Sequence, residues 1–172
     1  MPNEAVQRGQ AADGHGIVLW VPTIANKFRP TVAELTANTV KHLTYGLGSD
    51  GFSHDHQIAT ISISRYTLDQ ALELDGVHTD TVEVKWVYNR VAPTAIETTL
   101  GTPGVDGNIV HILGYPNDHV IDEDTKINAI IPVTTSVPRD VPPTQNSELM
   151  KIQKLNIRDK VAREHEIEVQ AS

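Results

Sequence analysis

Apolar and polar residues alternate along several short segments of this chain, and this period of two restricts the fold more than any other feature. In TVEVKWVYN (81–89), Val82, Val84 and Trp86 fall on one face of an extended strand, whereas Glu83 and Lys85 fall on the other. Comparable alternation, or a short run of apolar and β-branched residues, occupies 16–21, 39–45, 58–66, 108–115, 125–137 and 161–169. The chain is therefore predicted to be rich in strands.

One segment carries the signals of a helix. In PTAIETTL (93–100), Pro93 or Thr94 opens the segment, Ile96 and Leu100 share a helical face, and Gly101 follows as a stop. We therefore expect an all-β fold, a sandwich or barrel with one short flanking α-helix.

The length of 172 residues suits one domain. We expect a single β domain at 16–172, with a proline-rich extended connection at 138–148. Residues 1–15 are expected to form an N-terminal arm, which either orders on a neighbouring subunit or stays disordered. We expect the N-terminus to be retained, because it lacks the apolar run of a signal peptide.

Composition argues against several functional classes. The chain has no cysteine, which excludes disulfides and thiolate chemistry. No 18 apolar residues follow one another, so we expect no membrane partner. The formal net charge of −8 is concentrated in residues 50–124, and no basic stripe with interleaved aromatic residues marks nucleic-acid affinity. We expect no cofactor and no tight DNA binding.

The stretch SDGFSHDHQ (49–57) raises the question of a metal site. His54 and His56 would lie on one side of a strand, and a metal-dependent hydrolase could use both as ligands. A third ligand and a nucleophile are not indicated nearby, so we expect no metal. The alternative is a polar hairpin loop at 46–57 between two strands, with Phe52 at its tip either inserting into a partner or packing on its own subunit.

Other loops give no sign of catalysis. DEDTK (122–126) lacks the glycine and distal glutamate of a helix-loop-helix calcium site. GTPGVDG (101–107) lacks the lysine and following helix of a phosphate loop, and no serine sits in a nucleophile elbow. We therefore expect no enzyme and no catalytic residue.

Three segments, in chain order, resemble a known family. They are RPTVAELTAN with LTYGLGSDGF, then VEVKWVYNRVAPTAIETTLGTPG, and finally PPTQNSELMKIQKLNIRDKVAREHEIEV. Together they are similar to the major tail tube protein of long, non-contractile-tailed bacteriophages, within the fold group that includes type VI secretion tubes. The resemblance spans about residues 16–169.

The resemblance implies a structural virion protein. Its subunits would form hexameric rings whose inner strands join into one β-barrel around a channel, and the rings would stack helically into a tube. Implied partners are further copies of the chain, the tape measure protein, tail terminator and distal tail proteins, with non-specific passage of DNA. The chain would reside in the host cytoplasm before assembly and in the virion tail afterwards.

The resemblance also assigns residues to contacts. Gly51, Phe52, His54 and His56 become candidates for ring stacking through the 46–57 loop. Acidic side chains that repel DNA from the channel wall are expected on strands, although each could equally solvate the outer surface; the lumen candidates are Glu83, Glu164, Glu166 and Glu168. Open alternatives are a tail terminator or head-tail joining ring, a contractile-system inner tube, and the hydrolase described above.

Overall fold

The computed structural model describes residues 5–172, so residues 1–4 of the expected arm lie outside the described part. The chain divides into two compact units. The first contains the residues up to Tyr45, together with Asp106–Pro132 and Lys160–Ser172, and the second contains Gly46–Val105 and Val133–Asp159. The units are described separately below.

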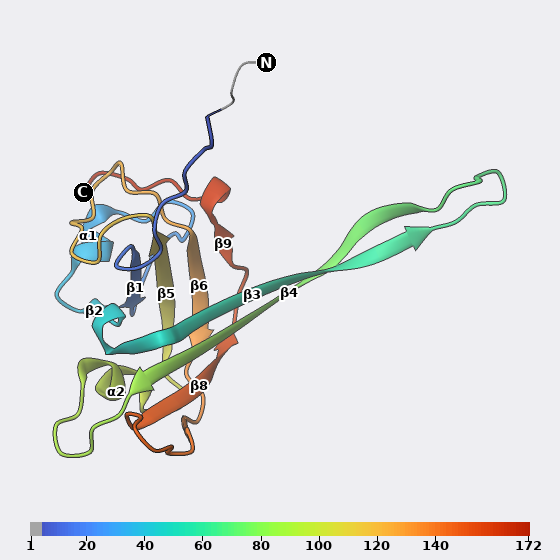
Figure 1. Ribbon diagram of the computed structural model, residues 1–172. Coiled ribbons are helices and arrows are strands. Elements are labelled where there is room, and N and C mark those ends of the chain that lie inside the picture. Colours follow the sequence, from blue (N-terminus) through green and yellow to red (C-terminus); the bar gives the residue numbers. More distant parts are fainter. Residues whose placement is uncertain (1–4) are drawn as a thin grey trace. The chain divides into compact units, whose positions relative to one another are not determined.

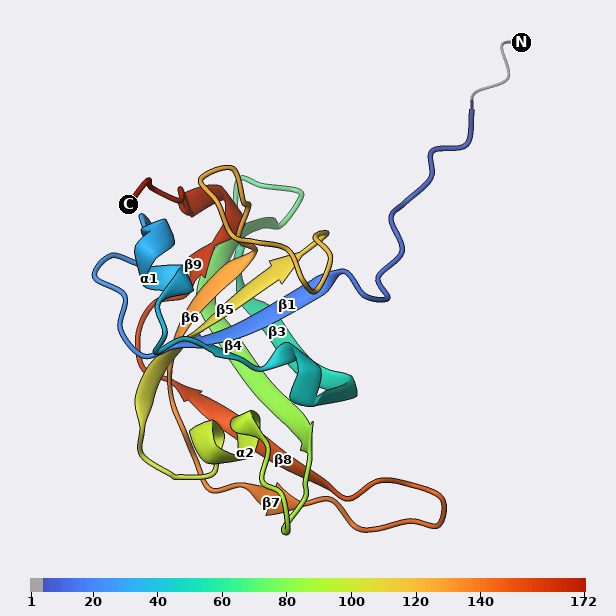
Figure 2. The same cartoon turned by 90° about the vertical axis from the view of Figure 1, so that its left-hand side faces the viewer.

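The first unit is built on antiparallel strands. They are β1 (Gly16–Val21), β2 (Lys41–His42), β5 (Asp106–Leu113), the first four residues of β6 (Ala129–Thr134) and β9 (Ala162–Arg163). Their order is β2-β1-β5-β6, with β9 paired to β6. Figure 2 shows β1, β5, β6 and β9 side by side in this order. Pairs such as Ile17↔Ile112 and Leu19↔Val110 bring aliphatic side chains together. These residues, with Ile130, form a core that is almost completely removed from water.

A second helix that the sequence analysis did not predict lies in the first unit. The helix α1 (Val32–Thr36) begins after Thr31, whose side chain accepts a hydrogen bond from the backbone N–H of Glu34. Glu34 in turn accepts from the backbone N–H of Thr31, and Leu35 is buried. This reciprocal capping box satisfies two N–H groups that a helix start leaves unpaired.

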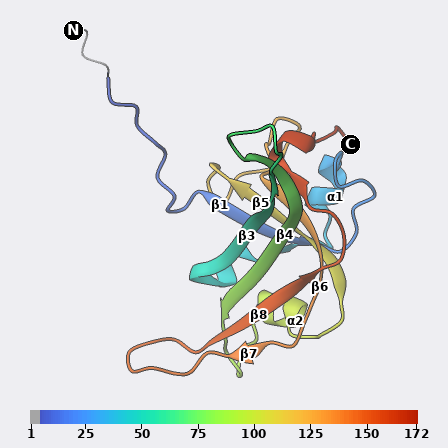
Figure 3. The same cartoon turned by 90° about the vertical axis from the view of Figure 1, so that its right-hand side faces the viewer.

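The second unit contains the two longest strands. They are β3 (Leu47–Ile63) and β4 (Leu72–Val87). The strand β8 (Met150–Ile157) pairs with β4, so the order is β8-β4-β3 (Figure 3). The short β7 (Arg139–Asp140) and the last two residues of β6 also pair with β8. Val82, Val84 and Trp86 are fully buried, as the alternation predicted. The other helix, α2 (Ala95–Leu100), confirms the prediction at 93–100, with Thr94 as its N-cap.

The all-β prediction is confirmed, with two short α-helices rather than one. Three strand predictions were too long. Residues 39–45 give only β2 and the 3₁₀ turn η1 (Thr44–Gly46), and residues 161–169 give only β9 and the 3₁₀ turn η2 (Glu164–Glu166). Residues 125–137 give only the six residues of β6. No helix within residues 5–172 has the length and hydropathy to cross a membrane.

Candidate functional site: the β3–β4 hairpin

The β3–β4 hairpin continues far beyond the sheet that holds its base. β8 pairs with β4 only along Val82–Val87, whereas β3 and β4 pair with each other as far as Ile63↔Leu72 (Figure 1). Within the part of the chain that the structure describes, no strand pairs with the outer edge of β3. Among residues 5–172, no strand pairs with the outer edge of β4 from Leu72 to Thr81 either. The hairpin therefore presents two open strand edges.

Residues 46–57 were predicted to be a loop, and this prediction was wrong because Leu47 to Gln57 belong to β3. The connecting turn lies instead at residues 64–71, where Tyr66 is fully exposed and Leu68 is 41% exposed. The misassignment has a physical cause. The segment contains glycine, serine and aspartate, which disfavour strands, but β4 is long enough to pair with all of it.

A bulge near the base of the hairpin requires glycine at position 51. Between the pairs Leu47↔Trp86 and Phe52↔Val84, β3 advances five residues while β4 advances two. Gly51 is buried in this bulge, and a Cβ at this position would lie 2.6 Å from the backbone nitrogen of Gly48 and from the carbonyl oxygen of Lys85. Only glycine fits such a close approach of backbone segments.

Asp50 forms an ion pair with Lys85 across this bulge. The Lys85 Nζ lies 3.0 Å from Asp50 Oδ2, and its hydrogen bond holds the pKa of the exposed Asp50 carboxyl below its ordinary value. Phe52 follows the bulge and is partly buried. It is therefore not the apolar tip of a solvated loop.

A second irregularity changes which face of the ribbon is apolar. Between Ile58↔His78 and Thr60↔Asp75, β3 advances two residues and β4 advances three. Cross-strand partners share a face, and side chains alternate along β3, so Ile61 lies on the face opposite Ile58.

The apolar residues therefore lie on opposite faces in the two halves of the hairpin. In the proximal half (47–58 and 78–87), the face that carries the buried Val82 and Val84 is apolar at the base, and farther along it carries His54, His56, His78 and Asp80. In the distal half (59–63 and 72–77), the apolar residues lie on the other face and pair as Ile61↔Leu74 and Ile63↔Leu72. We call these four residues the distal apolar face, and we call the opposite side, formed by Thr60, Ser62, Glu73 and Asp75, the distal polar face.

The distal apolar face is open to solvent. Ile61 is 51% exposed, Leu72 49% and Leu74 55%. An isolated two-stranded ribbon is marginally stable in water, and contiguous exposed aliphatic side chains are one feature of interaction surfaces.

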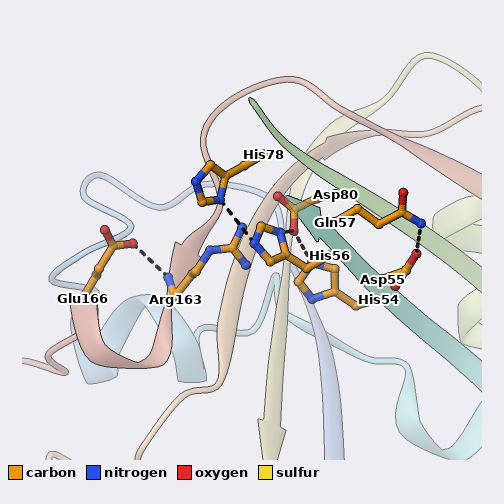
Figure 4. A network of polar contacts seen from close by, with 8 residues as sticks. All are labelled: His54, Asp55, His56, Gln57, His78, Asp80, Arg163 and Glu166. Atoms are coloured by element: carbon orange, nitrogen blue, oxygen red, sulfur yellow. Dashed lines mark hydrogen bonds and ion pairs between the residues drawn. The ribbon is translucent and has the colours of Figure 1, made fainter. Parts of the chain in front are cut away.

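His54 and His56 do come together, but around a carboxylate (Figure 4). Asp80 Oδ1 lies 2.8 Å from His54 Nε2 and 3.1 Å from His56 Nδ1, and His56 Nε2 lies 3.3 Å from His78 Nδ1. The rings of His56 and His78 also stack, with centroids 5.2 Å apart. Asp55 points to the other face, where its carboxylate accepts a hydrogen bond from the Gln57 side chain.

This cluster does not have the arrangement of a metal site. Among residues 5–172, no three His, Asp or Glu side chains are placed to hold a metal ion together. Asp80 accepts hydrogen bonds from two imidazoles, and this ties β3 to β4 across the proximal half. Sequence analysis missed Asp80 because its proximity to His54 depends on the register of a hairpin whose turn was misplaced.

The four lumen candidates lie in two different settings. Glu83 is on the polar face of β4 opposite Ser53, with a side chain 42% exposed and 4.0 Å from Arg139 Nη2. The other three belong to the first unit: Glu164, Glu166 and Glu168.

The predicted row of glutamates along a C-terminal strand does not exist. Glu164 and Glu166 occupy η2, and the backbone N–H of Glu168 donates to the carbonyl oxygen of Phe28, a residue outside the strands. Glu166 is bound by Lys160 Nζ at 3.1 Å, and this hydrogen bond lowers the pKa of its carboxyl. Alternation along a strand therefore cannot place these three side chains on one wall.

Comparison with known proteins gives one family. The family model described as phage tail tube protein matches residues 3–168. No curated protein matches the chain. Two solved structures have a similar fold. One belongs to the cryo-EM structure of the anti-feeding prophage baseplate, 6-fold symmetrised. It is 10% identical in sequence, the match covers 91% of this chain and 98% of that chain, and the TM-score is 0.50. The other belongs to the anti-feeding prophage cap, a tube terminating cap, with 12% identity, coverage of 94% and 95%, and a TM-score of 0.50.

Proposed function

Because the chain belongs to the phage tail tube protein family and is a structural component of a phage tail rather than an enzyme, we propose that its copies close into hexameric rings that stack into the tail tube. The tube would enclose the tape measure protein, join terminator and distal tail proteins at its ends, and conduct DNA into the host. We propose a long, non-contractile tail, on the resemblance of the three segments described above.

The observation that carries ring closure is the pair of open edges on the β3–β4 hairpin. One copy offers the outer edge of β3, and the next can offer the outer edge of β4 between Leu72 and Thr81. A row of copies paired in this way still has one unpaired edge at each end. Only a closed ring of identical copies would pair every edge. The resulting sheet would be the continuous barrel around the channel.

The charge of the chain supports passage of DNA without retention. Nearly all of the hairpin, from residue 50 to residue 87, lies in the segment 50–124, where the excess of Asp and Glu is concentrated. Each Lys or Arg contact to phosphate adds salt-dependent affinity, whereas carboxylates near the wall repel the strand over about 10 Å at 0.1 M salt. Glu83 is the lumen candidate that belongs to the hairpin itself, and Glu164, Glu166 and Glu168 stay proposals on the first unit.

Ring stacking is proposed to use the same hairpin. The bulge at the base of the hairpin accounts for glycine at position 51. Phe52, His54 and His56 are partly buried in the proximal half. Their role in stacking therefore stays a prediction, which the Phe52→Ala variant tests.

The main competing function is a single ring, such as a terminator or a head-tail joining ring. The similar fold of a tube terminating cap is the observation that favours it. A contractile-system inner tube is a further candidate, and it would require a sheath partner.

Negative-stain electron microscopy of the purified chain across a concentration series separates these functions. Stacked rings that lengthen with concentration support the tube, and single rings that never stack support a terminator or joining ring. A monodisperse monomer at every concentration, also in the presence of tape measure protein as initiator, would refute both. Phe52→Ala should shorten tubes without removing rings if Phe52 lies between rings.

A further inference from the structure

The dipeptide Asp-Gly occurs four times in this chain, beginning at Asp13, Asp50, Asp75 and Asp106. The side-chain carboxyl of an aspartate can be attacked by the backbone nitrogen of the next residue, and glycine permits this approach because it has no Cβ. Three of the pairs lie within the strands β3, β4 and β5, whereas Asp13 and its glycine form a turn before β1. The four pairs therefore differ in how freely they can react.

Two of the strand pairs are held by close contacts. The Asp50 carboxylate is ion-paired with Lys85. Gly107, which follows Asp106, is buried, and a Cβ there would collide with the ring of Trp20. Each pair can react only in molecules whose strand has opened locally, and this opening costs free energy.

The pair at Asp75 is the strongest competitor, because its carboxyl is exposed. It is nevertheless part of the ladder of β4, where Asp75 pairs with Thr60. A Cβ at Gly76 would lie 2.8 Å from the carbonyl oxygen of Ala59, so the backbone is crowded on this side. This pair too has to disturb the ladder before its backbone nitrogen can approach the carboxyl.

The pair at Asp13 has none of these restraints. Asp13 and Gly14 are exposed, and the N–H of His15 donates to the carbonyl oxygen of Ala12 at 3.1 Å, which closes the turn. Gly14 has φ +72, and a Cβ there would meet nothing within 4 Å. Within residues 5–172, no atom accepts a hydrogen bond from the Gly14 N–H. The attacking nitrogen is therefore unhindered and available.

His15 adds a group that favours the reaction. Its Nδ1 lies 2.8 Å from the carbonyl oxygen of Asp13, and because a carbonyl oxygen only accepts, Nδ1 carries the proton and donates it. This carbonyl belongs to the peptide bond that contains the Gly14 nitrogen. A donor at the oxygen stabilises the negative charge that spreads onto it as the nitrogen loses its proton.

We propose that Asp13 is a site of spontaneous isoaspartate formation that His15 promotes. The Gly14 nitrogen loses its proton and bonds to Asp13 Cγ, the carboxyl C–OH bond breaks, and the hydroxyl leaves with that proton as water. The product is a cyclic succinimide, which a second water molecule opens. Opening at the main-chain carbonyl leaves Gly14 joined to Cγ, so the main chain gains one carbon atom; opening at Cγ restores aspartate.

The change falls where the N-terminal residues join β1. The added carbon lies between Ala12 and His15, whose hydrogen bond closes the turn. The backbone N–H of Asn117 also donates to the Gly14 carbonyl oxygen, at 3.1 Å. Isoaspartate would therefore alter the attachment of residues 5–12 to the first unit in aged chains. The proposal is independent of whether copies of the chain assemble.

Ageing of the natural chain tests the site. The protein is incubated at neutral pH and low concentration, and isoaspartate is quantified at all four pairs by peptide mass spectrometry with electron-transfer fragmentation. In the folded chain it should accumulate at Asp13 at least about tenfold faster than at each strand pair, equivalent to about 1.4 kcal/mol in activation free energy. In urea the four rates should lie much closer together, because no strand restrains them. Equal rates in the folded chain, or a faster reaction at Asp75, would overturn the proposal.

A pair of histidine variants tests the role of His15. His15→Ala should slow the reaction at Asp13 several-fold in the folded chain and leave it unchanged in urea. His165→Ala removes another exposed imidazole of the first unit and should not change the rate at Asp13. Fluorescence of Trp20, which is buried in the same unit, checks that each variant keeps its fold. An equal or faster reaction at Asp13 in folded His15→Ala would overturn the role of His15.

Discussion

Replacement of Gly51 by alanine tests whether this residue shapes the hairpin or contacts another copy. The added Cβ would lie 2.6 Å from two backbone atoms and 2.7 Å from a third, closer than Cβ atoms are found in proteins. Backbone atoms inside a bulge can move apart only if the local pairing of β3 with β4 changes. Overpacking of this kind costs about 1–3 kcal/mol, so we take about 2 kcal/mol as the expected loss in the free energy of unfolding.

Gly48→Ala is the matched control. Its Cβ would meet Met150 Cε at 2.5 Å, which is the end of a flexible side chain rather than backbone. Met150 can change rotamer, so little loss of stability is expected. Both glycines belong to the same bulge, and the comparison therefore isolates the backbone contact from the general effect of adding a methyl group to β3.

The assay is thermal unfolding at a concentration below assembly, monitored by tryptophan fluorescence. The chain has two tryptophans, Trp20 in the first unit and Trp86 in the second, so a Trp20→Phe background reports the second unit alone. A loss of about 2 kcal/mol lowers Tm by roughly 4–8 °C for a chain of this size. Gly51→Ala should show this fall and Gly48→Ala should stay near the parent.

Two results would refute the reasoning. Equal melting of Gly51→Ala and the parent would show that the bulge relaxes without cost. An unchanged Tm with loss of tube formation would show that Gly51 acts in contacts between copies, as the sequence analysis predicted, rather than in the fold of the hairpin.

Three further outcomes are expected. The buried indole N–H of Trp86 donates to the Glu97 carboxylate at 2.6 Å, and Glu97→Ala removes this acceptor. The variant should lower the free energy of unfolding, measured in urea, by about 2 kcal/mol. Glu97→Gln should lower it by less, and equal losses of stability in the two variants would contradict this account. Asn146 has φ 61, so Asn146→Ala should lower stability by about 1 kcal/mol in the same assay and Asn146→Gly should not. The backbone hydrogen bond from Thr31 lowers the pKa of the Glu34 carboxyl below its ordinary value. The stabilising effect of this carboxylate is therefore fully present above the ordinary pKa of a glutamate and is lost as pH falls through the lower folded-state pKa. Glu34→Gln should flatten the dependence of Tm on pH across this range, and an unchanged slope would contradict the assignment.

Local patterns were sufficient for the parts of the fold whose partners are close in sequence. Alternation placed Val82, Val84 and Trp86 in the core, and the signals of a helix start and stop located α2. The helix α1 was also within reach, because Thr31 and Glu34 have the spacing of a capping box, although five residues carry too little apolar periodicity to be noticed.

The hairpin could not be predicted in the same way, because its features depend on register. Nothing local to SDGFSHDHQ indicates that it is a strand, and the decisive fact is the length of β4 across from it. Asp80 meets His54 only through that pairing, and Leu74 changes face only because β4 gains one residue relative to β3. A shift of one residue moves side chains to the other face of a sheet, so small errors in register change every inference about surfaces.

On the proposed function, the same hairpin must stay apart in the monomer and pair when copies meet, and its charge pattern bears on both requirements. Open strand edges promote uncontrolled pairing unless charged side chains lie along them. Glu73 and Asp75 stand beside Leu72 and Leu74 on β4, so two hairpins that approach at random bring carboxylates together. Only an arrangement that buries the leucines while keeping the carboxylates in water offsets this repulsion. In a regular ladder the leucines would fall on the face that carries Val82 and Val84 and the carboxylates on the opposite face, so the register shift at Gly76 exchanges the two faces of the ribbon without mixing them.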